Sequence, residues 1–569
     1  MPGNQHSGEP HGTIGLPTPF GRRRRHVRRY REIAQILLKH GFGQFLDILE
    51  LAPFVSLPRR LLRDESVDTG GAPVRLRLVL EELGPTFVKF GQILSTRPDI
   101  VPPAYLHELV KLQDTVPPVQ FDAIRASVEA ELDAPLETLF SQFEPTPLAS
   151  ASLGQVHAAQ LPDGQDVVVK VQRPGISATV ETDLEILYDL SRLVQERTAL
   201  GEVYDLVEIA DDFAATLRAE MDYRREGRNA DRFRSNFAGE SVLYVPAVYW
   251  EYTTRRVLTL ERIEGIRIDA VEQLEAAGID RHQVAVNAAQ IVMREVFDHG
   301  FFHADPHPGN FVVMPDATIG AMDFGMVGHI DRALKDSLMR LFIVSVRRDV
   351  AGMADELLRM GVAEPRVDRR RLERDLRFLL EKYRDLPLRE IRAQELVNDI
   401  NPVVFRHHLH FPTDLWLLAK TLVMLEGVGL QLDPDFDMLG VAMPFAQRKA
   451  AELSSPVAVG GRLMEAASDL VDELLHLPEQ WRRIVQQIEQ GQIRLVVAQE
   501  PREAELERAD RMVRRLAATL VLAAFILGTA LLVSQVAAGQ RAVLFATLGI
   551  FAISGSIAFL VWLLAMLRR

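Results

Sequence analysis

The chain of 569 residues contains no cysteine. Its chemistry therefore cannot include a disulfide, a thiolate metal site or a cysteine nucleophile, and the absence fits a reducing compartment. An excess of positive charge is also missing, because the net charge is −13, and this argues against a nucleic-acid-binding protein. Residues 1–20 lack an apolar segment of the kind that forms a signal peptide.

Positive charge is instead concentrated near the start of the chain. Residues 22–31 contain seven arginines and no acidic residue. Such a run is typical of an arm that lies near an anionic membrane or nucleic acid, and the alternative is a solvated tail. Since the net charge disfavours nucleic acid, we expect residues 1–27 to form a disordered basic N-terminus.

Long apolar runs occur at the other end, at residues 516–536 and 543–567. Each is about as long as the roughly 20 residues that a membrane-spanning helix needs. The basic residues that flank the pair are Arg511, Arg514, Arg515, Arg568 and Arg569, and the loop between the runs has Arg541 alone. By the positive-inside rule this predicts a two-pass hairpin in the cell (inner) membrane with a cytoplasmic body. A hairpin buried in a soluble domain is the alternative.

Hydrophobic spacing and turn residues divide the rest of the chain. Helical spacing runs through residues 73–145, with breaks expected at Gly84-Pro85, Pro102-Pro103 and Pro117-Pro118, and through most of 268–439. Two short β-type runs joined by Pro162-Asp163-Gly164 predict a β-hairpin between these two regions. We expect a small β-rich lobe over a larger helical lobe. The expected parts are a helical N-terminal extension (28–144), an N-lobe (145–265), a C-lobe (266–445), a helical connector (446–515) and two transmembrane helices (516–567).

The predicted hairpin carries two features that suit a nucleotide site. A loop of small residues precedes its first strand and lets backbone N–H groups approach phosphates closely. Its second strand ends at Lys170, which is placed to contact the α- and β-phosphates. The loop residues expected at ATP are Ala149, Ser150, Ala151, Ser152, Leu153, Gly154, Gln155 and Val156. An ordinary turn and a solubilising lysine are the alternatives for these features taken alone.

A charged helix follows and holds Glu220, Asp222 and Glu226. A lysine at the phosphates needs a helix-borne glutamate to hold it in place. Glu220 and Glu226 are six residues apart, so on one helix of about 3.6 residues per turn they point in different directions and should do different jobs. A solvated helix face is the alternative for either acid alone.

The segment from His303 to Asn310 has the spacing H-x-D-x-x-x-x-N, and an Asp-Phe-Gly triplet begins thirteen residues later at Asp323. In a phosphoryl-transfer site of this kind, one carboxylate, here Asp305, orients or deprotonates the attacking hydroxyl. Asn310 and Asp323 would hold Mg²⁺ across the phosphates. All these motifs in this order predict a kinase-like ATP site.

The residues between the two motifs support this interpretation. Phe311–Met314 and Ile319–Met322 are short β-type runs that would present the second aspartate on a hairpin. A metal site made of His303, Asp305 and His307 is an alternative, but it leaves the Asp-Phe-Gly triplet unexplained.

With these motifs the sequence resembles the UbiB/AarF-type atypical kinases, the ADCK family of eukaryotic organelles, over roughly residues 28–440. The most specific segment is Lys89-Phe-Gly-Gln92, which is similar to the family's KxGQ motif. The other similar segments are the Ala-rich loop 149–157, the strand around Lys170, the ExD motif Glu220-Met-Asp222 and the segment 301–310.

The resemblance implies an α+β, two-lobed protein-kinase-like fold with a helical N-terminal extension and a C-terminal transmembrane helical hairpin. It implies that Lys170, with Glu226 as its helix partner, contacts phosphates and that Asp305 is the catalytic-loop acid. Lys89, Gly91 and Gln92 would lie on an extension folded over the active site, where Lys89 approaches the acids of the ExD motif and acts in catalysis.

The function that the resemblance implies is a membrane-anchored, Mg²⁺-dependent ATPase or atypical kinase. It would bind ATP and membrane lipids and support ubiquinone or other isoprenoid-quinone biosynthesis, with a quinone precursor or other prenyl lipid and quinone-biosynthesis proteins as partners. Two alternatives stay open, a Ser/Thr-type protein kinase and an ATP-binding scaffold of a biosynthetic complex.

Overall fold

The computed structural model describes residues 19–454 apart from short gaps and the longer segment 52–70. The short gaps are 44–45, 47, 50, 99, 113–115, 199–200, 202–204, 364–366, 385 and 387–389. Contacts divide the chain into two units, Met1–Gly460 and Gly461–Arg569, and all described residues belong to the first. The expected membrane helices at 516–567 therefore lie outside the described residues, as do residues 1–18 and the connector from 455 onward.

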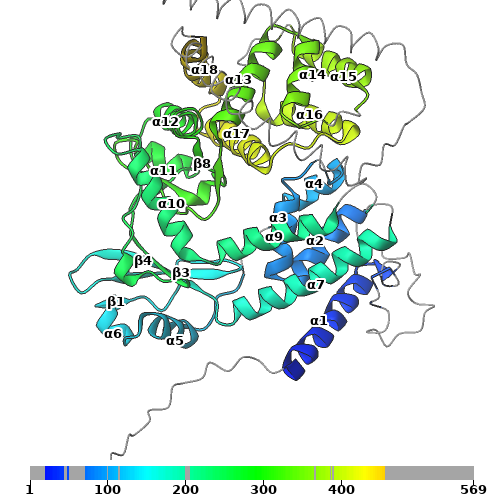
Figure 1. The fold of residues 1–569 in the computed structure, drawn as a ribbon. Coiled ribbons are helices and arrows are strands. Elements are labelled where there is room, and N and C mark those ends of the chain that lie inside the picture. The colour runs from blue at the N-terminus through cyan, green and yellow to red at the C-terminus, as the bar shows by residue number, and fades with distance from the viewer. Residues whose placement is uncertain are drawn as a thin grey trace, which may run out of the picture. The chain divides into compact units, whose positions relative to one another are not determined.

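The described residues form a mixture of helices and short strands (Figure 1). The helices are α1 (Pro19–Lys39), α2 (Ala72–Leu83), α3 (Pro85–Leu94), α4 (Pro103–Leu109), α5 (Phe121–Leu132), α6 (Leu136–Leu139), α7 (Ile176–Arg197), α9 (Leu206–Glu220), α10 (Tyr223–Asn236), α11 (Val271–Ala276), α12 (Arg281–Arg294), α13 (Arg332–Val346), α14 (Val350–Arg359), α15 (Arg369–Lys382), α16 (Ala393–His407), α17 (Thr413–Leu432) and α18 (Met438–Ser454). Shorter helical turns are η4 (Trp250–Tyr252), η5 (Glu295–His299) and η6 (Pro308–Asn310).

The strands are β1 (Gln142–Phe143), β2 (Ala149–Ser150), β3 (Gly154–Gln160), β4 (Asp166–Gln172), β5 (Leu243–Tyr244), β6 (Val257–Glu261), β7 (Ile266–Arg267), β8 (Phe301–His303), β9 (Phe311–Val313), β10 (Ile319–Ala321) and β11 (Val327–His329). One sheet has the order β1-β3-β4-β6 with β2 paired to β3, a second has the order β5-β10-β9-β7, and β11 pairs with β8. The expected hairpins β3–β4 and β9–β10 are confirmed, and both are antiparallel.

The β3–β4 hairpin shows why Lys170 is available for chemistry. Val167, Val169 and Val171 of β4 are fully buried in a hydrophobic cluster with α5 and α6. Because side chains alternate along a strand, Lys170 lies on the opposite face of the sheet. The alternating pattern thus buries three valines and presents one ammonium group.

The charged segment that holds Glu220, Asp222 and Glu226 consists of two helices, so the expected single helix is wrong. α9 ends at Glu220, and α10 begins at Tyr223 because Asp222 caps it, accepting the backbone N–H of Arg224 at 3.2 Å. The break places Glu220 and Glu226 on different helices. Upstream, the long helix α7 packs beside α9 (Figure 1), and its buried face includes Leu184 and Leu187.

The helical extension has its own core. α1, α2, α3 and α4 share a cluster of buried apolar side chains with one residue of α7, Ile186. The expected breaks at Gly84-Pro85 and Pro102-Pro103 are confirmed, because α3 and α4 begin at the prolines. The expected disorder of residues 19–27 is wrong, since these residues belong to α1, whose later apolar residues Ile33 and Ile36 pack in this core.

The larger helical part surrounds β8 to β11. Phe301, Phe302 and Phe324 are buried in a cluster with residues of α12, α17 and α18. This packing fixes both ends of the His303–Phe324 stretch. α18 continues through Ser454, nine residues beyond the end expected for the C-lobe at 445.

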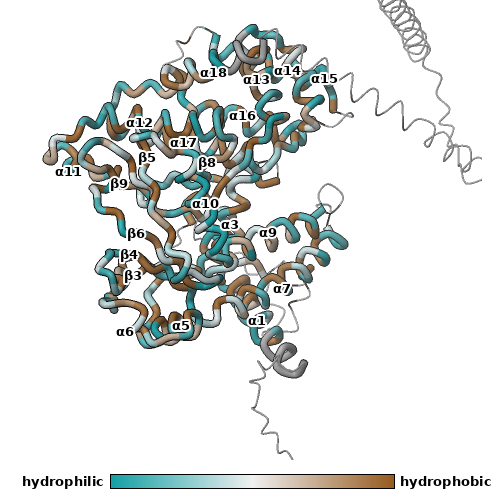
Figure 2. The backbone as a smooth tube through the Cα atoms, turned by 60° about the vertical axis from the view of Figure 1, so that its left-hand side comes forward, coloured by the Kyte–Doolittle hydropathy of each residue, from teal (hydrophilic) through white to brown (hydrophobic). Residues whose placement is uncertain are grey.

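Helix α17 is mostly hydrophobic along its length (Figure 2). Among the described residues it is long and apolar enough to cross a membrane, with a mean hydropathy of 1.4, by length and composition alone. It packs against α12 and contacts β11, however. These contacts make it a core helix of this unit.

Two glycines inside helices provide a matched test of the packing. A Cβ at Gly91 of α3 would overlap the side chains of Leu80 and Leu112, whereas a Cβ at exposed Gly427 of α17 would meet open space. Gly91→Ala should lower the thermal unfolding midpoint, because overpacking costs about 1–3 kcal/mol and exceeds the ~1 kcal/mol gain in helix propensity. Gly427→Ala should raise the midpoint through that gain alone. Equal shifts in both variants would contradict the close packing of α3.

Candidate active site

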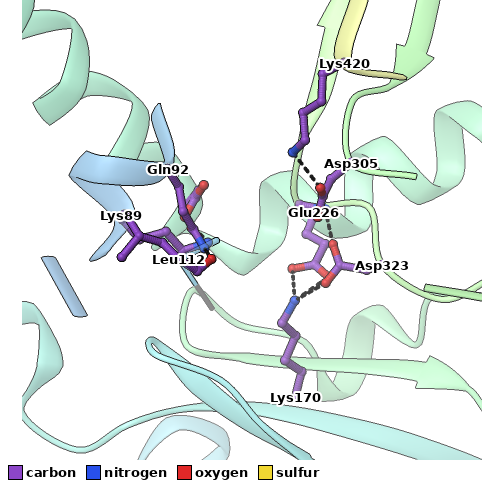
Figure 3. A network of polar contacts seen from close by, with 10 residues as sticks. Lys89, Gln92, Leu112, Lys170, Glu226, Asp305, Asp323 and Lys420 are labelled. Carbon is purple, nitrogen blue, oxygen red and sulfur yellow. Dashed lines mark hydrogen bonds and ion pairs between the residues drawn. The ribbon is translucent and has the colours of Figure 1, made fainter. Parts of the chain in front are cut away.

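A single ammonium group joins three of the residues that the sequence singled out. Lys170 Nζ lies 2.8 Å from both carboxylate oxygens of Glu226 and 2.9 Å from Oδ2 of Asp323 (Figure 3). The other carboxylate oxygen of Asp323 accepts the backbone N–H of Gly325 at 2.9 Å. The structure thus places the strand lysine, the helix glutamate and the Asp-Phe-Gly aspartate in one network.

The two carboxylates around Lys170 differ in acidity. Burial and, to a smaller extent, the nearby charge of Asp323 raise the pKa of Glu226 to about 7 against the attraction of Lys170. Burial opposes ionisation of Asp323 too, but Lys170 and the Gly325 N–H offset it, so the pKa of Asp323 lies well below its usual value. Burial by itself would lower the pKa of Lys170, yet the two acids raise it. Asp323 is therefore the carboxylate that stays ionised.

Helix α10 contributes more than Glu226. The side-chain amide of Asn229, one turn further along, donates to the carbonyl oxygen of Phe324 at 2.9 Å. One helix therefore holds both Lys170 and the backbone that carries Asp323. This explains how the triplet is fixed relative to the sheet.

His303 connects the two aspartates through their backbones. Its Nδ1 accepts the N–H of Asp305 at 3.2 Å, and its Nε2 donates to the carbonyl oxygen of Asp323 at 2.6 Å. Burial lowers the pKa of His303, which agrees with a neutral ring. Because both ring nitrogens are engaged, the alternative metal site made of His303, Asp305 and His307 has no support in this geometry.

Asp305 lies at the open side of the site. Its Oδ1 accepts a hydrogen bond from Lys420 Nζ at 2.7 Å, and its backbone carbonyl accepts one from the side-chain amide of Asn310 at 3.1 Å. The carboxylate of Asp305 is 40% exposed, so a reacting hydroxyl or water can reach it. This is the arrangement that a proton acceptor requires.

Asn310 and Asp323 fit the expected magnesium site. Mg²⁺ takes oxygen ligands and in nucleotide sites uses one or two carboxylates together with phosphate oxygens. Asn310 uses its NH₂ group toward Asp305, which leaves its amide oxygen as an acceptor, and Asp323 supplies an ionised carboxylate. The described residues include no group of three or more His, Cys, Asp or Glu that could hold a metal by themselves, so phosphate oxygens would supply the remaining ligands.

The Ala-rich loop forms the β2–β3 turn. Ala149 pairs with Val156, Ser150 pairs with Gln155, and Ala151 donates its N–H to the carbonyl of Gly154 at 2.8 Å. Ser152 and Leu153 complete the turn and are buried. The turn closes a tight hairpin at one end of β3.

Two further contacts hold this turn near the network. The guanidinium of Arg173 donates to the Ala151 carbonyl and the Ser150 hydroxyl, both at 2.8 Å. A Cβ at Gly154 would overlap the hydroxyl of Tyr223, whose ring lies 5.3 Å from Lys170 Nζ. Glycine at position 154 therefore lets the turn approach α10 closely.

The KxGQ segment lies on α3, on one side of the Lys170 network in Figure 3. Lys89 Nζ is 3.4 Å from a carboxylate oxygen of Glu220, and the Gln92 side chain donates to the Leu112 carbonyl at 3.2 Å. The approach of Lys89 to the ExD motif thus occurs at Glu220. The carboxylate of Asp222 forms an ion pair with Arg224 in addition to capping α10.

Tyr223 is influenced by lysines of both the KxGQ segment and the network. Burial and the acids Glu226 and Asp323 raise its pKa, while the charges of Lys170 and Lys89 lower it. Both lysines are therefore close enough to the same phenol to act on it.

Sequence reasoning missed several residues of this site. Asn229, Tyr223 and Lys420 carry no motif of their own, and their partners lie far away in the chain. His303 was recognised as part of a motif but without a role. For Lys420 the available signal was the single lysine of a mostly apolar helix, Thr413–Leu432.

Three family models match the chain. The ABC1 atypical kinase-like domain matches residues 111–357, the UbiB helical domain matches residues 376–437, and the ABC1/UbiB kinase-like C-terminal domain matches residues 502–569. The expected kinase-like fold with helices and sheets is thereby confirmed. The helical-domain match includes most of α15 to α17, and hence Lys420.

Curated proteins from bacteria are similar over most of their length. The probable protein kinase UbiB of Marinobacter nauticus is 36% identical over 528 residues, which cover 90% of this chain and 95% of that protein. The uncharacterized protein sll1770 of Synechocystis is 38% identical, with 80% and 78% covered. Among solved structures, the Rv3197–erythromycin complex from Mycobacterium tuberculosis aligns at 23% identity with a TM-score of 0.46, covering 67% of this chain and 95% of that one.

Behind the His303–Asn310 loop lies a buried acid, Glu295. Its side chain is 2% exposed and accepts the backbone N–H of His303 at 3.1 Å. Burial raises the pKa of Glu295 from 4.5 to about 8 against this hydrogen bond. Because Glu295 holds its proton more tightly in the folded state, it stabilises the fold at pH values below its unfolded-state pKa. This stabilisation is lost as the pH rises toward about 8.

Glu295→Gln should remove this pH dependence, because glutamine keeps the acceptor oxygen but cannot ionise. In the wild type, each rise of one pH unit within this window lowers the free energy of unfolding by at most about 1.4 kcal/mol. The thermal midpoint of the variant should therefore fall less than that of the wild type between about pH 5 and pH 8. Glu272→Gln, at an exposed position of α11, is the control. Parallel profiles for the wild type and Glu295→Gln would contradict the assignment.

Proposed function

Because the chain belongs to the ABC1/UbiB family of atypical kinase-like proteins, we propose that it is a membrane-anchored, Mg²⁺-dependent ATPase or kinase of small lipid-like molecules. In this proposal it supports ubiquinone or other isoprenoid-quinone biosynthesis. The observation that carries the proposal is the Lys170–Glu226–Asp323 network with Asp305 close by.

The residues of the network have separate tasks in this proposal. Lys170, held by Glu226, binds the α- and β-phosphates of ATP. Asn310 and Asp323 hold Mg²⁺, which neutralises charge on the phosphates when it is bound. Asp305 orients the attacking oxygen and accepts its proton.

The reaction follows from these tasks. The oxygen of water or of an acceptor hydroxyl forms a bond to the γ-phosphorus, and the bond from that phosphorus to the bridging oxygen of ADP breaks. The electron pair of the broken bond stays with ADP. The proton of the attacking group passes to the Asp305 carboxylate and then to solvent. The products are ADP and either phosphate or a phosphorylated acceptor.

The packing of α3 favours a small acceptor. α3 is held by the Lys89–Glu220 ion pair and by a ring contact between Phe90 and Phe213, with centroids 5.0 Å apart. In this proposal the extension, which lies on one side of the Lys170 network in Figure 3, limits the approach of a folded protein to the nucleotide. This supports water or a lipid-like acceptor over a protein substrate.

The membrane part of the proposal comes from the sequence. The apolar runs 516–536 and 543–567, with arginines outside them, support a two-pass anchor in the cell membrane and a cytoplasmic kinase-like domain. Membrane lipids, a quinone precursor and quinone-biosynthesis proteins are the partners that such an anchor would bring near.

Asp323→Asn should abolish Mg²⁺-dependent ATP turnover, because the amide cannot carry the negative charge that the metal and Lys170 require. The expected loss is at least about 100-fold, in the range found for other electrostatic catalytic groups. Turnover is measured as phosphate release by the full chain in lipid vesicles. Asp316→Asn, in the exposed β9–β10 turn, is the matched control and should keep its activity. Full activity in Asp323→Asn would show that the site is assigned wrongly.

Turnover by the wild type should rise several-fold when the vesicles contain a phenolic quinone precursor, because the acceptor or cargo lies in the bilayer. The same samples are analysed for phosphate on the phenol and on protein. A turnover rate that changes with neither the membrane nor the precursor would refute the lipid part of the proposal. Phosphorylated protein would favour a protein kinase, and binding without turnover would favour a scaffold.

A further inference from the structure

Lys420 brings a second cation to the catalytic acid. Its Nζ lies 2.7 Å from Oδ1 of Asp305, and the two side chains are 35% and 40% exposed. In Figure 3 Lys420 reaches the site from the side opposite to Lys170. The ammonium group therefore lies at the solvent-accessible part of the site, where an incoming phosphate would arrive.

The position of Lys420 is fixed by its helix. The neighbouring Thr421 is fully buried and donates its hydroxyl to the carbonyl of His303 at 3.2 Å. At the start of α17, Asp414 accepts the backbone N–H of His329 at 2.9 Å. His303 and His329 lie on the paired strands β8 and β11. The helix is thus joined to the strands that carry the catalytic loop.

The need for this cation follows from the charges around it. A phosphoryl group in transfer spreads negative charge over its outer oxygens, and enzymes stabilise that charge with cations. The loop 303–310 contains no lysine or arginine. Lys170 is engaged by Glu226 and Asp323. Next to Asp305, the cation in contact is Lys420.

We propose that Lys420 is a catalytic residue that binds the γ-phosphoryl group of ATP. The inference rests on the proposed function and deepens it. Without nucleotide, Lys420 is paired with Asp305. When the triphosphate enters, the ammonium group moves to a γ-phosphate oxygen and leaves the Asp305 carboxylate free to accept the proton of the attacking group.

The lysine keeps its own proton throughout the reaction. The bond between the attacking oxygen and phosphorus forms, the bond to the oxygen of ADP breaks, and Asp305 receives the released proton. Lys420 stabilises the charge on the phosphoryl oxygens while this occurs. The segment matched by the UbiB helical domain, residues 376–437, thereby supplies a residue of the active site.

Measurements of nucleotide affinity distinguish direct binding of the γ-phosphate by Lys420 from a role in which Lys420 only positions Asp305. The dissociation constants of Mg²⁺-bound ADP and of the Mg²⁺-bound β,γ-imido analogue of ATP are measured by calorimetry on the full chain in lipid nanodiscs. Lys420→Met, which keeps the aliphatic stem, should weaken binding of the triphosphate by about 10-fold or more and leave ADP within about 2-fold, as expected for a lost charge-assisted hydrogen bond. Lys420→Arg should keep most of the preference for triphosphate.

A double variant tests whether Lys420 acts only through Asp305. Asp305→Asn should strengthen triphosphate binding, because it releases Lys420 and removes a negative charge. In that background Lys420→Met should still cost about 10-fold. Lys382→Met is the matched control, since Lys382 lies in the same matched domain and forms an ion pair with Asp399 away from the site. It should change neither constant.

Three outcomes would overturn the inference. An unchanged triphosphate-to-ADP preference in Lys420→Met would show that Lys420 does not contact the γ-phosphate. If the methionine variant unfolds, Lys420→Gln repeats the test. A loss that disappears in the Asp305→Asn background would make Lys420 a positioning residue. A wild type that binds neither nucleotide would refute the proposed function itself, and the inference with it.

Discussion

The ammonium group of Lys170 is the point at which three separately packed parts of the protein meet. Lys170 comes from β4, Glu226 from α10, 56 residues later, and Asp323 from the segment after β10, 153 residues later. The side chain of Lys170 is only 23% exposed, and an unpaired charge largely removed from water costs several kcal/mol, so the fold must also bring its acids to it. The sheet, α10 and the Asp-Phe-Gly triplet are consequently fixed relative to one another by one cation.

Asp323 and Glu226 suit different roles because their surroundings differ. Asp323 also accepts a backbone N–H from Gly325, which keeps it ionised, whereas Glu226 is buried and its pKa rises to about 7. The carboxylate with the lower pKa is the one that the proposed magnesium site would require. Glu226 is suited to hold Lys170, a task for which a strong permanent charge matters less than position.

Local patterns in the sequence predicted the parts of the fold that depend on neighbouring residues. Short β-type runs joined by a Pro-Asp-Gly turn indicated β3 and β4, and the Gly84-Pro85 and Pro102-Pro103 steps indicated where helices end. The family resemblance grouped Lys170 with Glu226, the motif spacing added Asp323, and the structure brings the three side chains into contact. These features depend on residues that are close together in the sequence or that belong to a known motif, so the sequence alone reveals them.

The failures have two physical causes, local helix capping and tertiary contact. The break between α9 and α10 depends on whether Asp222 caps a helix, and a charged helical pattern alone does not reveal that choice. The basic run belongs to α1 because apolar residues further along the helix pack on α2 and α7. Lys420 and Asp305 are 115 residues apart, and nothing local marks either as the partner of the other. The first failure concerns a local cap between residues two apart, and the other two concern tertiary contacts.

Lys89 of α3 and Lys420 of α17 each form an ion pair with an acid at or near the site. The two pairs differ in how exposed they are. Lys89 and Glu220 are 17% and 14% exposed, whereas Lys420 and Asp305 are 35% and 40% exposed. An ion pair as exposed as the second contributes about 1 kcal/mol or less, so the hydrophobic packing of α17, and not the pair, sets the position of Lys420. A lysine held by its helix in this way can exchange a carboxylate for a phosphate at little cost to the fold. The more buried Lys89 pair would lose more on separation, which suits a contact that holds α3 in place.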